Sequence, residues 1–264
     1  TNTLNVGKVW DVMVDIVVEQ CEKDGLEPMS INPVVGECND SRINRIQKRA
    51  VGAAEVRQAF ASVADDFEEG AVGAGTGTIC YGMKGGIGSA SRVIRIGEKE
   101  YTIGVLVQSN FGATEDFVLN GEAVGAKILD WKQEKDDMAA SEEDKGSIMS
   151  ILATDLPLTS RQLKRILRRT GVGIARTGGY TGHGSGEVMI GFTTENRIPS
   201  GTEEKLLQIQ AIPEHVINRA FLAAAEAEQE AILNSMTAAE RTRGLAGELY
   251  YSLAEYLEDQ DPKQ

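Results

Sequence analysis

Histidine is scarce in this 264-residue sequence, and the shortage limits the chemistry that the chain can perform. The two histidines, His183 and His215, are too few for a zinc site built from several histidines. A Ser-His-Asp triad would have to use one of these two side chains. We expect no metal site and, as a separate expectation, no other cofactor.

Cysteine and positive charge are also in short supply. The three cysteines are widely spaced, form no Cys-x-x-Cys pair and leave an odd one over, which argues against a disulfide framework and favours a reducing compartment. The 27 Lys and Arg residues face 40 Asp and Glu residues, and the net charge of −13 argues against nucleic acid or an anionic membrane as a partner.

Long apolar runs are absent as well. No run approaches the roughly 20 residues that a membrane span needs, and no signal-peptide pattern stands at the front. The apolar content of 41% is nevertheless enough for a substantial core. We expect one cytoplasmic domain over residues 1–264 that binds neither nucleic acid nor membrane.

Glycine, in contrast, is abundant and gathers in residues 70–92 and 178–186. The first cluster is no phosphate loop, because Lys84 precedes Gly85 instead of Ser or Thr, and no G-x-G-x-x-G spacing is complete. In the second, Ser185 is not in a G-x-S-x-G nucleophile elbow. We interpret the glycines of the first cluster as points where backbone passes close to backbone or to a substrate.

Apolar periodicity predicts helices and strands in mixed order. A highly charged stretch, 131–145, is interpreted as a solvated loop. The order favours an α+β fold, a layered α/β/β/α sandwich. Helices are expected over 9–21, 50–65, 162–176, 213–235 and 237–257, and strands over 34–35, 91–96, 101–108, 147–153 and 187–194.

Ser147 is the first candidate catalytic residue. It follows Gly146 directly, at the joint between the charged loop and an apolar strand. Self-cleavage at this joint would give Ser147 both a hydroxyl nucleophile and a free α-amine, whose pKa of about 8 in model peptides suits a general base at neutral pH. The alternative is ordinary turn chemistry, since Gly-Ser commonly ends a loop.

Three further side chains are placed where a site could form. Asn110 ends the strand before Phe111 and could be a catalytic amide or a turn former. Ser185 and Glu187 are two residues apart at the start of a strand, where an extended backbone would point them the same way. Glu187 could hold an ammonium group or orient an α-amine, or it could be part of a solvated strand end.

Several long motifs occur in one order along almost the whole chain, and together they resemble the D-aminopeptidase and β-peptidyl aminopeptidase family of self-processing hydrolases with an N-terminal serine. They are T-N-T-L-N-V-G from Thr1, P-V-V-G-E ending at Glu37, G-A-G-T-G-T-I-C-Y-G-M-K-G-G-I-G-S-A-S-R from Gly73, G-V-L-V-Q-S-N-F-G from Gly104, G-S-I from Gly146, A-T-D-L-P-L from Ala153 and R-T-G-G-Y-T-G-H-G-S-G-E ending at Glu187.

The resemblance implies a role for each candidate. Ser147 corresponds to the nucleophile that cleavage after Gly146 releases, which would divide the chain into 1–146 and 147–264. Asn110 corresponds to the amide of the oxyanion site, and Ser185 and Glu187 to the pair that positions the nucleophile and its amine. Glu37 corresponds to the acid that binds the free amino group of a small peptide, amide or ester. The family also implies a tetramer of processed heterodimers.

Two departures and several alternatives stay open. The family pattern at its glutamate is E-x-[YW]-D, with an aromatic residue two positions after the glutamate, whereas this chain has Asn39 two positions after Glu37. In addition, about a hundred family residues before T-N-T have no counterpart here. A specialised amidase of the pantetheine-amide type, an acyltransferase of a related self-processing fold, and a non-catalytic binding domain are the competing interpretations. Thr1 as the nucleophile is disfavoured, because T-N-T is internal in longer family members.

Overall fold

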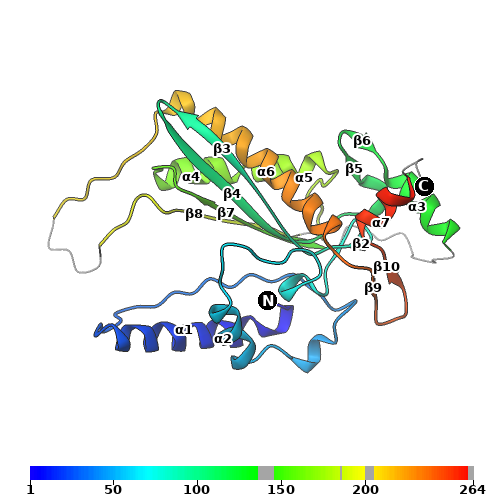
Figure 1. The fold of residues 1–264 in the computed structure, drawn as a ribbon, viewed down its shortest axis with the longest axis horizontal. Helices are drawn as coiled ribbons and strands as arrows, with labels where there is room; N and C mark the ends of the chain where they lie inside the picture. Colours follow the sequence, from blue (N-terminus) through cyan, green and yellow to red (C-terminus); the bar gives the residue numbers. More distant parts are fainter. Residues whose placement is uncertain (136–145, 185, 200–204, 261–264) are drawn as a thin grey trace.

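A four-stranded sheet forms the centre of the protein (Figure 1). The computed structural model describes residues 1–135, 146–184, 186–199 and 205–260. Neighbouring strands are antiparallel except for β7 and β8, which are parallel. The strands, in spatial order, are β3 (Ile87–Ile96), β4 (Lys99–Asn110), β7 (Ser147–Thr154) and β8 (Gly186–Thr193).

Helices cover one face of this sheet (Figure 1). The long helix α6 (Ile217–Thr237) crosses β3 and β4, while α4 (Ser160–Leu167) and α5 (Thr170–Arg176) lie beside it. Alternate residues of the strands, such as Val105 and Leu152, are buried against the helices. The helix approaches closely because its buried face is rich in alanine and because β3 has Gly88, where a Cβ would lie 2.1 Å from the carbonyl oxygen of Ala231.

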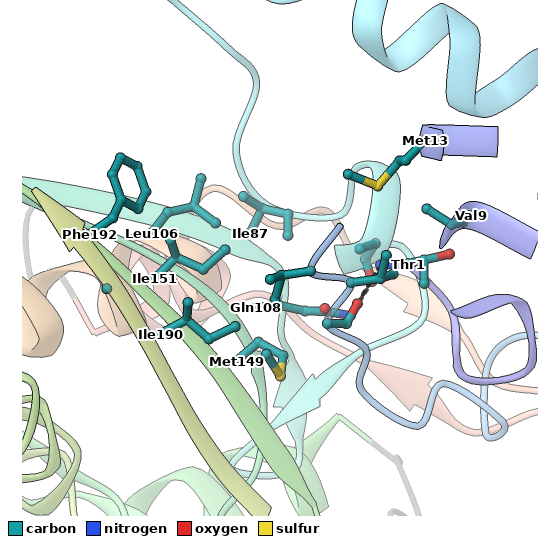
Figure 2. A pocket seen from close by; sticks show the side chains of 15 residues that line it. Thr1, Val9, Met13, Ile87, Leu106, Gln108, Met149, Ile151, Ile190 and Phe192 are labelled. Atoms are coloured by element: carbon teal, nitrogen blue, oxygen red, sulfur yellow. Dashed lines mark hydrogen bonds between the residues drawn. The ribbon is translucent and has the colours of Figure 1, made fainter. Parts of the chain in front are cut away.

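The opposite face of the sheet looks toward α1 (Val6–Lys23) and α2 (Ala53–Ala61) (Figure 1). Between α1 and the sheet lies an apolar cleft of about 620 Å³. Figure 2 shows Met13 of α1 and Leu106, Met149 and Ile151 of the sheet around this cleft.

The first glycine cluster forms a tight hairpin against the ends of β3 and β4. Strands β1 (Ile79–Cys80) and β2 (Met83–Lys84) are joined by Tyr81 and Gly82, both with positive φ, as a type I′ turn requires. Close backbone approach explains several other glycines of this cluster: a Cβ on Gly86 would lie 2.3 Å, and one on Gly75 2.6 Å, from the carbonyl oxygen of Gly70. The interpretation as close-approach points is confirmed at these positions, whereas a Cβ on Gly73 would meet no atom of the described residues within 4 Å.

The remaining elements are short and connect the sheet to its surroundings. They are η1 (Thr3–Asn5), η2 (Ile46–Lys48), η3 (Gly73–Gly75), η4 (Thr114–Asp116), β5 (Val118–Leu119), β6 (Glu122–Ala123), α3 (Gly125–Glu134), η5 (Glu214–Val216), β9 (Thr242–Arg243), β10 (Leu249–Tyr250) and α7 (Leu253–Asp259).

The α+β class and most of the predicted elements are confirmed, but the strand predicted at 34–35 is wrong. Val34 is exposed at 67%, and the segment lines the cleft without pairing to a described strand. The loop predicted over 131–145 is wrong at its start, because α3 continues to Glu134. Trp131 is buried and donates a hydrogen bond to Asp259 (2.9 Å), which charge density along the sequence cannot reveal. Residues 136–145 lie outside the described part.

Two predicted helices also differ. The helix expected over 162–176 is divided into α4 and α5 by a turn at Arg168 and Arg169. Gly173 of α5 packs against the backbone of α6, where a Cβ would lie 2.6 Å from the carbonyl oxygen of Ala225. The helix expected over 237–257 is a hairpin of β9 and β10 followed by α7. Gly247 has a φ of +99°, which an α-helix cannot contain.

Candidate active site

Ser147 and Asn110 lie directly opposite each other in the sheet. Ser147 begins β7, Asn110 ends β4, and the two residues are partners in the antiparallel register. Side chains of such partners lie on the same face with their Cβ atoms about 4.5–5.5 Å apart. Two residues separated by 37 positions in the sequence therefore bring a hydroxyl and an amide together, on the sheet face that borders the apolar cleft.

The Asn110 amide is held at both ends. Its Oδ1 accepts a hydrogen bond from the backbone N–H of Ile79 (3.0 Å), and its Nδ2 donates to the carbonyl oxygen of Asn39 (3.2 Å). The first bond fixes which end of the amide is oxygen. Because an amide nitrogen carries two N–H groups, Asn110 can bind Asn39 and a developing oxyanion at the same time.

Gly146, the residue before Ser147, fits a space that admits no side chain. A Cβ there would lie 1.9 Å from the carbonyl oxygen of Asn110. The carbonyl oxygen of Gly146 accepts a hydrogen bond from the N–H of Gly186 (3.1 Å). The Gly146–Ser147 peptide bond is thus held between two strands with its carbonyl group polarised, as a bond under nucleophilic attack needs to be.

The segment around Glu37 runs beside the ends of β4 and β7. The Cys38 thiol donates toward the carbonyl oxygens of Gln108 (3.5 Å) and Ser147 (3.6 Å), and burial raises the pKa of that thiol to about 11, so it stays neutral. One carboxylate oxygen of Glu37, Oε2, is buried and has no hydrogen-bond partner among the described residues. A buried acceptor of this kind is suited to an incoming cationic group.

The second glycine cluster approaches Ser147 from the other side. Gly186 is the register partner of Ser147 in β8, and a Cβ on Gly186 would lie 3.8 Å from that of Ser147. Glu187 pairs with Ile148, so strand alternation directs its side chain to the face opposite that of Ser147. Ser185 lies outside the described residues.

Asn39 is the residue at which the sequence departs from the motif that it resembles. It is exposed, and its Oδ1 accepts a hydrogen bond from the N–H of Ser41 (3.0 Å). Its side chain therefore caps a local turn, while its backbone carbonyl holds Asn110. Position 39 therefore has an amide side chain and cannot supply a phenolic hydroxyl to the site.

Sequence reasoning missed two residues that support this arrangement, Cys38 and Lys84. Lys84 is fully buried and donates to the carbonyl oxygen of Thr78, the residue before Ile79. Its signal in the sequence is a lone lysine within an apolar, glycine-rich stretch. In the described part of the chain, no group of three or more His, Cys, Asp or Glu residues is arranged for a metal ion, and no helix is long and apolar enough to cross a membrane.

Comparisons with known proteins identify relatives of this chain by sequence and by fold. The chain is 34% identical over 261 residues to a β-peptidyl aminopeptidase from Sphingosinicella xenopeptidilytica; the match covers 96% of this chain and 65% of the relative. The chain thus spans less than two thirds of that relative's length.

Two solved structures are similar throughout. The PH0078 protein from Pyrococcus horikoshii OT3 is 44% identical with a TM-score of 0.86, over 97% of this chain and 70% of that one. The L-aminopeptidase D-Ala-esterase/amidase from Ochrobactrum anthropi, described as a variant of the Ntn hydrolase fold, is 33% identical with a TM-score of 0.86, over 98% and 70%. The match to a family profile covers residues 1–250, and the chain belongs to peptidase family S58.

Proposed function

We propose that this protein is an aminopeptidase that releases the N-terminal residue of small peptides, amides or esters through an acyl-enzyme on Ser147. The observation that carries the proposal is the register pairing of Asn110 with Ser147, the residue that follows Gly146 in the sequence. It joins a nucleophile, an oxyanion donor and a cleavable Gly-Ser bond at one end of the sheet. The activities in the names of the relatives support the same reaction class.

Self-cleavage would come first. The Ser147 hydroxyl oxygen attacks the carbonyl carbon of Gly146, and the Gly146–Ser147 C–N bond breaks as the amine leaves with a proton. The resulting ester between Gly146 and the Ser147 hydroxyl is then hydrolysed by water, which leaves a Gly146 carboxylate and a Ser147 that carries a free amine. The N–H of Gly186 supports the first step, because it already donates to the carbonyl oxygen under attack.

Turnover would use the same atoms on a substrate. The free amine accepts the proton of the Ser147 hydroxyl as the oxygen attacks the substrate carbonyl carbon. Asn110 donates to the oxyanion, and its fixed orientation means that little reorganisation is needed as charge develops. The proton passes to the leaving amine, and water then hydrolyses the acyl-serine ester. Ser185 and Glu187 stay candidates for positioning the hydroxyl and the amine.

Glu37 would bind the free amino group of the substrate. Its buried Oε2 lacks a hydrogen-bond partner among the described residues, and an ammonium group would supply one together with a positive charge. The thiol of Cys38, the residue after Glu37, donates toward the carbonyl oxygen of Ser147, so the segment that carries the carboxylate lies beside the nucleophile. This arrangement favours an exopeptidase over an amidase that accepts blocked substrates.

The test compares free and N-acetylated alanyl p-nitroanilide as substrates. We expect cleavage of the free amine and none of the acetylated form. Glu37→Gln should lower kcat/KM for the free amine by an amount that corresponds to about 2–3 kcal/mol of lost transition-state stabilisation, because a charge-assisted hydrogen bond is lost. Glu27→Gln, a change of an exposed glutamate in the same N-terminal part of the chain, serves as the control.

Equal rates on the free and acetylated substrates would remove the aminopeptidase assignment and favour the specialised amidase. Transfer of the acyl group to an added amine in preference to water would favour the acyltransferase. The cytoplasmic location and the tetramer of processed heterodimers stay predictions from the sequence.

A further inference from the structure

Lys84 is a fully buried lysine whose ammonium group is surrounded by backbone carbonyls. Its Nζ donates to the carbonyl oxygens of Gly75 (2.8 Å), Thr78 (2.9 Å) and Gly85 (2.7 Å). Three acceptors match the three N–H groups of an ammonium, whereas a neutral amine has two. The surroundings therefore fit the charged form of the side chain.

One of these carbonyls connects Lys84 to the candidate site. The carbonyl group of Thr78 and the N–H of Ile79 belong to the same peptide group, and that N–H donates to Oδ1 of Asn110. A continuous path of hydrogen bonds therefore runs from the Lys84 ammonium through this peptide group to the Asn110 amide. Its far end is the Nδ2 group that faces Asn39.

We propose that Lys84 is a positioning residue for the oxyanion amide, acting on Asn110 through the Thr78–Ile79 peptide group. An ammonium on the carbonyl end of a peptide withdraws electron density and makes the N–H at the other end a stronger donor. That stronger donor in turn polarises the Asn110 amide and fixes its rotation. This inference rests on the proposed function, because it gives Asn110 the role of oxyanion donor.

A purely structural role for Lys84 would be to hold the glycine-rich segment together through hydrogen bonds. That role needs only N–H donors, whereas the proposed positioning role also needs the positive charge. Lys84→Gln keeps N–H donors for the carbonyls but removes the positive charge. The matched control is Lys132→Gln, which removes the charge of a second buried lysine; Lys132 donates to the carbonyl oxygen of Gly82 (2.5 Å), outside the path to Asn110. Both variants replace a buried ammonium beside the same hairpin.

At about pH 6, where most Lys84 side chains hold their proton, Lys84→Gln should lower kcat by about tenfold or more with KM within about threefold, since the interaction strengthens in the transition state. Lys132→Gln should leave both values nearly unchanged. In an Asn110→Ala background, Lys84→Gln should cost nothing further, because the residue that it acts on is absent. A folded, processed Lys84→Gln variant with unchanged kcat, or one equally impaired in both backgrounds, would overturn the proposal.

A second measurement does not depend on activity or on the folding of a variant. Burial lowers the pKa of Lys84 to about 7, and the facing titratable group that raises it is the Cys80 thiol. In ¹⁵N-labelled wild-type protein, the Ile79 amide and Asn110 side-chain amide signals should move together as Lys84 loses its proton with rising pH. Signals that do not follow this titration contradict the path. Absence of aminopeptidase activity would instead overturn the proposed function and leave this measurement valid.

Discussion

At the scale of single residues, the structure places the two central candidates, Ser147 and Asn110, next to each other. Both could be predicted because turn-forming residues mark the ends of their strands in the sequence: Gly-Ser begins one strand, and Asn-Phe-Gly ends another. Cys38 and Lys84 could not be found this way. Their partners are backbone atoms of distant segments, and a single sequence does not show which carbonyls a buried side chain meets.

The first residue-scale prediction concerns Asn110. Asn110→Ala should lower kcat by about a hundredfold or more with KM little changed, because an oxyanion donor acts mainly in the transition state. Asn39→Ala is the matched control, since it removes a neighbouring amide but keeps the backbone carbonyl that holds Asn110. Steady-state kinetics on alanyl p-nitroanilide provide the measurement.

Processing of the Asn110 variant has to be checked before its rate is interpreted, because Asn110 is the register partner of Ser147 and its removal also changes the surroundings of the bond that self-cleavage breaks. An Asn110→Ala protein that is cleaved, folded and as fast as the wild type would reduce Asn110 to a residue that orders the Asn39 turn.

At the scale of elements, α6 fits the sheet through small residues and a few buried polar pairs. Ser150 on β7 donates to Oε2 of Glu228 on α6 (2.6 Å), and the hydroxyls of Ser109 and Ser235 lie 2.6 Å apart. The sequence predicted this helix and the strands from their apolar periodicity. It did not predict the polar pairs, because they depend on the crossing of α6 over the sheet.

Glu228 makes the packing of α6 dependent on pH. Burial raises the pKa of its carboxyl from an ordinary value of 4.5 to about 8, so the folded protein holds a proton that the unfolded chain loses between these values. The free energy of unfolding should therefore fall as pH rises from about 4.5 to about 8, by up to about 1.4 kcal/mol per pH unit from this group.

Urea unfolding at several pH values between 5 and 8 tests this prediction. Glu228→Gln stays neutral and can still accept from Ser150, so its stability relative to wild type should increase toward pH 8. Glu226→Gln, on the exposed side of the same helix where it pairs with Arg92, should leave the slope unchanged. Parallel pH curves for the wild type and Glu228→Gln would show that the buried carboxyl does not hold the proton.

At the scale of the whole molecule, the alternation of helices and strands was enough to predict an α+β fold. The order β3-β4-β7-β8 was not predicted, and neither was the parallel pairing of β7 with β8. Sheet order depends on where α4 and α5 cross, and that crossing leaves no mark in the local pattern of either strand. The placement of Glu37 in the same site as Ser147 was inferred from family resemblance and not from periodicity; the structure brings its neighbour Cys38 to Ser147 across more than a hundred residues.

The whole-molecule prediction is that the chain divides into residues 1–146 and 147–264 and that the two pieces stay together. Strand β7 of the second piece pairs along its whole length with β4 of the first, and α6 of the second piece packs on β3 and β4. The fold therefore spans the cleavage point. The pieces should elute as one species under native conditions and separate only in denaturant.

Mass spectrometry of the purified protein provides the measurement. Two masses are expected, which together exceed the intact chain by one water. Ser147→Ala should stay whole because it lacks the attacking hydroxyl, while Ser150→Ala, which removes a serine of the same strand on the side that faces α6, should still be cleaved. A wild-type protein that remains a single uncut chain and still hydrolyses aminoacyl substrates would show that an internal residue, and not a released N-terminal serine, performs the reaction.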